Sequence, residues 1–247
     1  MAPTVEILPD KSALIQRTHE FMVTTLQDLI DKQGRATIAL SGGSTPKPLY
    51  ESMVKADLPW EKLFVFWGDE RYVPHDHEKS NYRMANEAWL NHVPIPEANI
   101  FPVPTGADNP AADANKYAET IKAFFEIDQG GIPSLDFVLQ GMGDDGHTAS
   151  LFPKTEALDV RDRLVTVGNH DGEPRITFTI PLINQGQKII FLIAGANKQA
   201  ALSKVFAEDA DNYSYPSRFV QMASPHWLMD EAASKGLPDS FKTDSSK

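Results

Sequence analysis

The first clear pattern along the chain is an apolar stripe at helical spacing. Between residues 10 and 33, apolar side chains that include Met22, Leu26 and Ile30 recur every three or four positions, which places them on one face of a helix. Gly34 follows the last of them and is a suitable helix stop. The pattern predicts a long amphipathic helix over residues 10–33.

Short apolar runs and further helical patterns then alternate along the chain. The runs predict strands at ATIAL (36–40), LFVFW (63–67) and LDFVL (135–139), and later in LVTV, RITFTI and KIIFLIA. Helices are predicted from near Pro46, over about 81–91, over 110–127 and in NKQAALSKVFAE. This alternation is typical of an α/β fold with a mostly parallel sheet and helices on both faces, and we predict that fold class.

Four polar segments follow predicted strands, and they are the first candidates for a functional site. They read SGGST, GDER, GMGDDGHT and AGANK. In open α/β sheets, ligands bind at the carboxyl ends of the strands. We therefore expect these segments to share one rim of the sheet.

Length and composition limit the classes of protein that remain. The 247 residues are 41% hydrophobic, enough for a sizeable core. No Pro/Gly/Ser-rich linker or repeat divides them, so we predict a single domain over 1–247 with a frayed polar tail at 239–247. The absence of cysteine excludes disulfides, thiolate nucleophiles and Cys-based zinc sites. The N-terminus lacks the features of a signal peptide, and the run 189–194 is too short to span a bilayer, so we expect a cytoplasmic protein.

The charge balance is strongly acidic, and this limits the classes of partner that the protein can bind. The net charge is −11, from 23 basic and 34 acidic residues. Such a surface argues against nucleic acid and anionic membranes as partners. If the substrate is an anion, a few cationic side chains must gather at one site against the overall field.

The segment GMGDDGHT contains a glycine fingerprint with unusual residues inside it. Its three glycines spell G-x-G-x-x-G after a predicted strand, a pattern typical of dinucleotide binding. Asp144 and Asp145 would repel a pyrophosphate, and Pro153 cuts short the helix that should receive it. The sequence therefore favours a loop that carries out chemistry itself, and it predicts no nucleotide cofactor.

His147 is the candidate base in that loop. Two carboxylates lie two and three residues before it, and either Asp144 or Asp145 is placed to fix the ring tautomer and raise its basicity. No G-x-S-x-G elbow and no cysteine nucleophile are present. A hydrolase built from these residues would use His147 to activate water directly.

The segment SGGST is a candidate phosphate-binding loop. It is not a P-loop, because the Gly-Lys pair is missing. Its glycines allow close approach, Ser44 and Thr45 offer hydroxyls, and a helix start offers partial positive charge. A plain Ser/Thr helix cap explains the same residues equally well.

Several charged residues elsewhere have both a site and a surface interpretation. Lys198 lies in the first turn of a predicted helix, where it gains nothing from the helix dipole, so a nearby anion would explain it. Arg175 begins a predicted strand, and GDER is either a surface ion pair or part of a site. The pair His75 and His77 lacks further ligands, and no metal site is predicted.

Together these segments resemble the 6-phosphogluconolactonase family. LSGGSTP, FWGDERYVP followed by SN, GMGDDGHTASLFP, RITFTIPLIN and AGANKQAAL occur in the family's order from about residue 36 to 205. The resemblance implies a fold of the glucosamine-6-phosphate deaminase and ribose-5-phosphate isomerase group. It also implies the hydrolysis of 6-phospho-D-glucono-1,5-lactone to 6-phospho-D-gluconate in the oxidative pentose phosphate pathway, without a cofactor.

The same resemblance implies roles for individual residues. His147 is implied as the general base, and Arg71 as a substrate clamp that stabilises developing charge. The implied phosphate and sugar pocket consists of Ser41, Gly42, Gly43, Ser44, Thr45, Asn81, Gly143, Asp145, Arg175 and Lys198. The implied partner is a small sugar-phosphate lactone, and we expect a monomer or small homo-oligomer.

Two alternatives remain at this point. A sugar-phosphate isomerase or amino-sugar-phosphate deaminase on the same fold would need a carboxylate base near C1 or C2, for which Asp69 is the candidate. A sugar-phosphate-sensing module of a transcription regulator would need a DNA-binding domain, and the chain offers neither spare length nor a basic patch for one.

Overall fold

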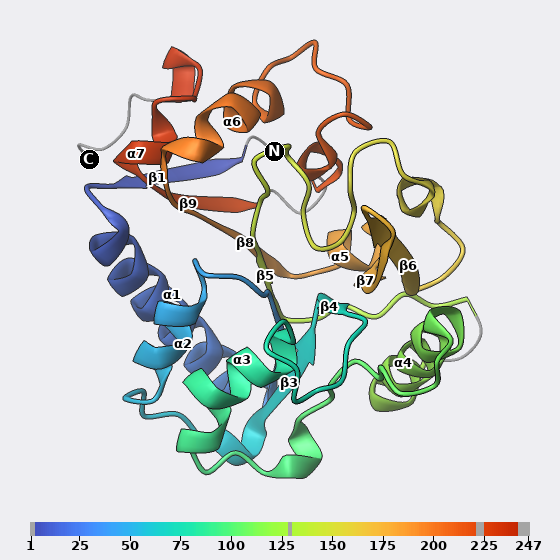
Figure 1. Ribbon diagram of the computed structural model, residues 1–247. Helices are drawn as coiled ribbons and strands as arrows, with labels where there is room; N and C mark the ends of the chain where they lie inside the picture. The colour runs from blue at the N-terminus through green and yellow to red at the C-terminus, as the bar shows by residue number, and fades with distance from the viewer. Residues whose placement is uncertain (1–2, 128–129, 221–224, 242–247) are drawn as a thin grey trace.

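Six parallel strands form the main sheet of the computed structural model, which describes residues 3–127, 130–220 and 225–241 (Figure 1). The strand order is β1-β9-β8-β5-β2-β3, and all five pairings are parallel. The strands are β1 (Thr4–Leu8), β2 (Ala36–Leu40), β3 (Leu63–Trp67), β5 (Phe137–Gln140), β8 (Lys188–Ile193) and β9 (His226–Asp230). Every residue of β2 and β5 is buried, as expected for strands covered on both faces.

Helices cover both faces of this sheet. They are α1 (Lys11–Gln33), α2 (Lys47–Met53), α3 (Asn81–Ala88), α4 (Pro110–Phe125), α5 (Ile180–Asn184), α6 (Gln199–Val205) and α7 (Glu231–Ser234). In β9, His226 packs against Phe21 of α1, whereas Trp227 packs against Phe206 at the end of α6. Successive side chains of a strand point to opposite faces, so α1 and α6 lie on opposite sides. The predicted fold class is confirmed.

The first helix forms as the apolar stripe predicts. The carboxylate of Asp10 accepts a hydrogen bond from the Ala13 N–H at the helix start. Met22 and Leu26 of the stripe are fully buried, and Gly34 ends the helix in the left-handed conformation at φ 82°.

A second, smaller sheet was not expected from the sequence. It is antiparallel and has the order β4-β7-β6, from β4 (Asp69–Arg71), β6 (Val165–His170) and β7 (Glu173–Phe178). The segment GDER follows a strand as predicted, but it was not expected to form one itself, and residues 69–71 pair with β7. Asp171 and Gly172 join β6 to β7 with φ values of 53° and 88°. An Asp-Gly pair between apolar runs is a strong hairpin signal, and it was missed.

Most other differences concern the ends of elements. The helix predicted over 81–91 ends at Ala88 and continues as a 3-10 turn at Leu90–His92. Strands β1 and β9 escaped prediction altogether. Of the polar tail, residues 239–241 form a 3-10 turn whose Phe241 ring packs against Phe206, and residues 242–247 lie outside the described residues.

The two sheets share one connected core of buried side chains. Trp67, Trp89 and Tyr50 are among its largest fully buried members. Within the described residues, none of the helices combines the length and apolar character that crossing a bilayer requires.

The carboxyl ends of β8, β5 and β2 lie next to one another in the sheet. The segments AGANK, GMGDDGHT and SGGST follow these three strands directly. The prediction that they share one rim is confirmed, and the small antiparallel sheet adds β4 and β7 to the same place.

Candidate active site

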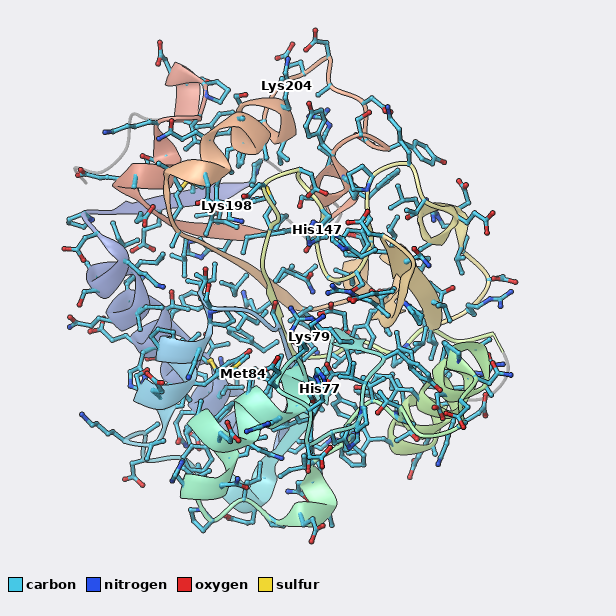
Figure 2. The ribbon with its side chains drawn as sticks, in the orientation of Figure 1. His77, Lys79, Met84, His147, Lys198 and Lys204 are labelled. Carbon is cyan, nitrogen blue, oxygen red and sulfur yellow. The ribbon has the colours of Figure 1, made fainter. Side chains whose placement is uncertain are left out.

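A polar pocket of about 250 Å³ opens at this rim. Figure 2 shows two of its residues, His147 and Lys198, on neighbouring segments of the rim. Its lining consists of Ser41, Gly42, Gly43, Ser44, Thr45, Pro46, Asp69, Arg71, Asn81, Gly141, Met142, Gly143, His147, Ala149, Arg175, Leu192, Ala194 and Lys198. Of the site residues named from the sequence, only Asp144 and Asp145 are not part of this lining, and they contact the lining residues Lys198 and His147.

A larger hollow of about 420 Å³ lies elsewhere, beside the end of α6 and Trp227. Arg218 is the charged residue in its lining. The Nη1 of Arg218 already donates to the carbonyl oxygens of Val205 and Ala207. Among its described lining residues this hollow thus has a single cation, whereas the polar pocket brings together Arg71, Arg175 and Lys198, and the polar pocket is the candidate site.

His147 is held by a tight turn in the loop after β5. The Gly143 N–H donates to the His147 carbonyl at 2.9 Å, and the Gly146 N–H donates to the Gly143 carbonyl at 3.1 Å. The carboxylate of Asp145 lies 2.6 Å from the ring Nδ1 and 3.0 Å from the backbone nitrogen of His147. Of the two acids that the sequence left open, Asp145 orients the ring.

The charge of Asp145 determines which tautomer of the His147 ring is favoured. Burial by itself would raise the pKa of Asp145, but hydrogen bonds from the ring and the backbone N–H of His147 outweigh it and lower that pKa to about 2. Asp145 is therefore an anion near neutral pH. An anion at Nδ1 favours the tautomer with its proton there, which leaves the Nε2 lone pair to accept a proton.

Asp144 has a different partner. Its carboxylate accepts hydrogen bonds from Lys198 Nζ at 2.5 Å and from Asn197 Nδ2 at 2.8 Å. The hydrogen bond from Lys198 is the main cause that lowers the pKa of Asp144. The anion that the position of Lys198 led us to expect is thus, in this structure, a carboxylate of the protein. An ammonium group has three N–H donors, so Lys198 keeps others for a ligand.

Two guanidinium groups face the pocket from neighbouring strands. Arg71 of β4 and Arg175 of β7 are directly opposite in the antiparallel register. Burial first, and then the charge of Arg71, lowers the pKa of Arg175. Like charges directly opposite in a sheet are destabilising. An anion bound between them would relieve that repulsion, so the pair forms a cationic wall suited to an anionic group.

Asn81 fixes one of these guanidinium groups. Its Oδ1 accepts from Arg71 Nη1 at 2.6 Å, and its Nδ2 donates to the Asp69 carbonyl at 2.9 Å. A Cβ on Gly42 would lie 1.8 Å from the Asn81 Oδ1. The SGGST loop therefore approaches this side chain so closely that only glycine fits at position 42.

The two acids of GDER have different surroundings. Asp69 lines the pocket and accepts a hydrogen bond from the Ser150 hydroxyl at 2.6 Å. Glu70 accepts from the N–H groups of Arg71, Asn81 and Tyr82 and from the Ser80 hydroxyl. Burial raises the pKa of Glu70 against the effect of these donors. Glu70 thus fastens the start of α3 to β4, and Asp69 is the acid that faces the pocket.

The SGGST loop is anchored by hydrogen bonds to a buried tyrosine. The hydroxyl of the buried Tyr50 accepts from the Ser41 N–H at 3.0 Å and donates to the Ser41 carbonyl at 2.7 Å. Gly43 has a φ of 102°, a conformation that favours glycine. All five residues of the loop line the pocket, ahead of the short helix α2.

The described residues contain no group of three or more histidine, cysteine, aspartate or glutamate side chains arranged to hold a metal ion. The histidines of the H-x-H pattern have ordinary partners. His75 Nε2 lies 2.7 Å from the Val103 carbonyl, and His77 Nδ1 accepts from the Lys79 N–H at 3.1 Å.

Some residues of the site were missed in the sequence. Ala149 lines the pocket with a φ of 48°, an uncommon conformation for a residue with a side chain. Ser150 supports Asp69, Asn197 supports Asp144, and Phe152 lies against His147. Ala149, Ser150 and Phe152 belong to the motif that ends in TASLFP, but spacing alone does not separate them from ordinary core and turn residues.

The fold has a counterpart among solved structures. A monomeric glucosamine-6-phosphate deaminase superposes with a TM-score of 0.81, over 94% of this chain and 99% of that one, at 19% identity. At that identity the likeness shows the fold alone. The two chains therefore share the α/β fold described above.

The family is shown by sequence. The model of the family "Glucosamine-6-phosphate isomerases/6-phosphogluconolactonase" matches residues 9–229, and the chain belongs to this family. A 6-phosphogluconolactonase of a Nostoc species is 58% identical over 238 residues, which cover 96% of this chain and 99% of the relative. The 6-phosphogluconolactonase structure from Trypanosoma brucei is 30% identical, with a TM-score of 0.82 over 96% of this chain and 99% of that one.

Proposed function

We propose that this protein is a 6-phosphogluconolactonase, which hydrolyses 6-phospho-D-glucono-1,5-lactone to 6-phospho-D-gluconate in the oxidative pentose phosphate pathway, with water activated by His147. The activity follows from the relatives of the chain. One observation carries the mechanism: the Asp145–His147 pair lies at the same pocket as Arg71, Arg175 and Lys198. A base and cationic groups for an anionic substrate are thus present at one site.

The reaction needs little catalytic power, because a δ-lactone is an activated ester. His147 Nε2 takes a proton from water as the water oxygen attacks C1. The carbonyl electron pair moves onto its oxygen, where Arg71 or backbone N–H groups of the loops stabilise the charge. When the C1–ring oxygen bond breaks, the ring oxygen takes the proton back from His147. The product is the open-chain acid, and no covalent intermediate with the enzyme forms.

The phosphate of the substrate holds the ring in place. We assign this role to Lys198, Arg175 and the SGGST loop, because each lines the pocket and offers cationic or hydrogen-bond donors. An anchor on the phosphate orients C1 against the base, which lowers the entropic part of the barrier. Asp145 takes part by fixing the ring of His147, and Asn81 by fixing Arg71.

Replacing Lys198 by alanine should raise KM by roughly 10-fold or more and change kcat much less. A charge-assisted hydrogen bond to the substrate contributes about 1.5–3 kcal/mol, and an anchor used equally in ground and transition states acts on KM. Steady-state kinetics on fresh lactone measure both constants. The control is Lys204→Ala on the exposed side of α6 (Figure 2). If neither Lys198→Ala nor Arg175→Ala changes KM, the phosphate assignment is wrong.

The reaction itself is tested by proton release. 6-Phosphogluconolactone is generated freshly and added with and without the protein, and the acid formed is followed in weak buffer. Catalysis appears as a faster release than the spontaneous one. The same preparation is tested on glucosamine 6-phosphate and aldose phosphates. Ketose formation without lactone hydrolysis would assign the pocket carboxylate of Asp69 as the base of an isomerase or deaminase.

We also propose that the chain acts as one catalytic domain in the cytoplasm, as a monomer or small homo-oligomer, without a cofactor. The single connected core supports the first point. The acidic surface, with a net charge of −11, supports a small-molecule partner over nucleic acid or membranes. Light scattering of the purified protein gives the assembly size.

A further inference from the structure

Phe152 lies where the loop of His147 meets the small antiparallel sheet. Its side chain is buried, with 5% exposed. Its ring centroid is 4.4 Å from that of His147 and 4.6 Å from that of His170 in β6. The guanidinium carbon of Arg175 in β7 lies 5.6 Å from the same centroid. One ring thus contacts the proposed base and one of the proposed anion-binding groups.

The contact with Phe152 helps to fix the position of Arg175. The Nε of Arg175 is buried and has no hydrogen-bond partner. The neighbouring Arg71 repels the guanidinium group, and the carboxylates of Asp69 and Glu173 attract it without a hydrogen bond that would fix its direction. The face of an aromatic ring attracts a guanidinium group, and the attraction grows when the pair is partly shielded from water. The ring of Phe152 supplies that attraction.

His147 depends on the ring in a different way. Asp145 holds the imidazole at Nδ1 only, and a hydrogen bond to one ring atom leaves the plane of the ring free to tilt. Packing against Phe152, at an interplanar angle of 46°, restricts that tilt. The direction of Nε2 is therefore set by two contacts, one polar and one aromatic.

The backbone around Phe152 is held independently of any ligand. The Phe152 carbonyl accepts from the Thr155 hydroxyl at 2.8 Å, and the neighbouring Leu151 is fully buried. A Cβ on Gly168 of β6 would lie 2.2 Å from the Ser150 carbonyl oxygen, so the loop is in close contact with the sheet. The backbone of Phe152 is therefore fixed, and from this backbone the ring holds the side chains of His147 and Arg175 in position.

We propose that Phe152 is a positioning residue, which holds the imidazole of His147 and the guanidinium group of Arg175 in a fixed relation. The role rests on the proposed function, in which His147 activates water and Arg175 binds the phosphate. The residue touches neither reacting atoms nor phosphate, and it acts through these two side chains. Loss of the ring should disturb the base and the anion site together, which simple loss of packing elsewhere would not do.

The test is Phe152→Leu, which keeps an apolar side chain and removes the ring. Kinetics with the phosphorylated lactone should show kcat lowered by roughly 10-fold, because the base is misaligned. KM should rise by about 3- to 10-fold, because a cation–π contact of ordinary strength is lost. In the absence of substrate, a crystal structure of the variant should show the imidazole plane of His147 tilted from its wild-type orientation, and the Kd for inorganic phosphate should rise by a similar factor to KM.

The matched control is Phe124→Leu. Phe124 lies in α4, packs against the Phe66 and Phe101 rings and carries the guanidinium group of Arg35 at 5.0 Å. This substitution removes the same kind of contacts far from the pocket. It should lower the melting temperature and leave kcat, KM and the orientation of His147 unchanged.

The outcomes separate the positioning role from the proposed function. If Phe152→Leu is destabilised like the control but keeps kcat and KM within twofold of the wild type and keeps His147 in its wild-type orientation, Phe152 only fills space and the inference is wrong. If Phe152→Leu does not fold, Phe152→Met, whose flexible side chain fills core gaps, is measured against the same expectations. If the wild type does not hydrolyse the lactone, the proposed function fails, and the crystal structure and the phosphate measurement still decide the positioning role.

Discussion

Replacing His147 by asparagine should lower kcat by ~10²–10⁴, the usual contribution of general base catalysis. Asparagine keeps the polarity and a donor for Asp145, but it removes the group that takes the proton from water. No serine or cysteine nucleophile is signalled in the sequence, so no other group takes over the attack. Stopped-flow proton release on fresh lactone, corrected for spontaneous hydrolysis, measures the loss.

Two further readouts make this prediction specific. The product 6-phosphogluconate should still bind, because the phosphate anchors are separate side chains. The kcat–pH profile should lose its acidic limb, and the limb cannot come from Asp145, whose pKa of about 2 keeps it charged over the working range. His92→Asn, on an exposed turn, is the control. Near wild-type kcat for His147→Asn would return the role of base to Asp69.

Replacing Gly143 by alanine should lower kcat by roughly 10²-fold without a large loss of stability. The added Cβ would lie 2.1 Å from His147 Nδ1 and 2.6 Å from Asp145 Oδ1, so the imidazole and the carboxylate must move apart. A displacement of about 1 Å at a catalytic group is enough for a 10²-fold loss. The backbone of Gly143 is outside the left-handed region, so alanine adds no backbone strain.

The control for this prediction is the same substitution in open space. Gly106→Ala places its methyl group where nothing lies within 4 Å and where φ is also outside the left-handed region. It should leave kcat and KM at wild-type values. Thermal unfolding of both variants shows whether folding is preserved. A Gly143→Ala enzyme with unchanged kcat would mean that the Asp145–His147 contact is not needed for the reaction.

The local sequence predicted the elements near the site well, because they depend on neighbouring residues. The stripe of α1, the strands β2, β3 and β5, and the loops after β2 and β5 follow from periodicity and turn residues. The small antiparallel sheet was not predicted from periodicity and turn residues. β4 consists of three polar residues, and its pairing with β7 joins residues about a hundred positions apart, which no local pattern encodes.

The candidate residues were also found from local motifs, but their partners were not. The sequence alone determined the candidates for the chemistry: a histidine beside two acids, two glycine loops, and a few cations on an acidic chain. Only the tertiary structure decided that Asp145 holds His147 while Asp144 holds Lys198, and that Arg71 lies opposite Arg175. The physical reason is the short range of the interactions that join these residues. Hydrogen bonds and ion pairs act over a few ångströms, and the fold alone brings residues 54 positions apart, such as Asp144 and Lys198, within that distance.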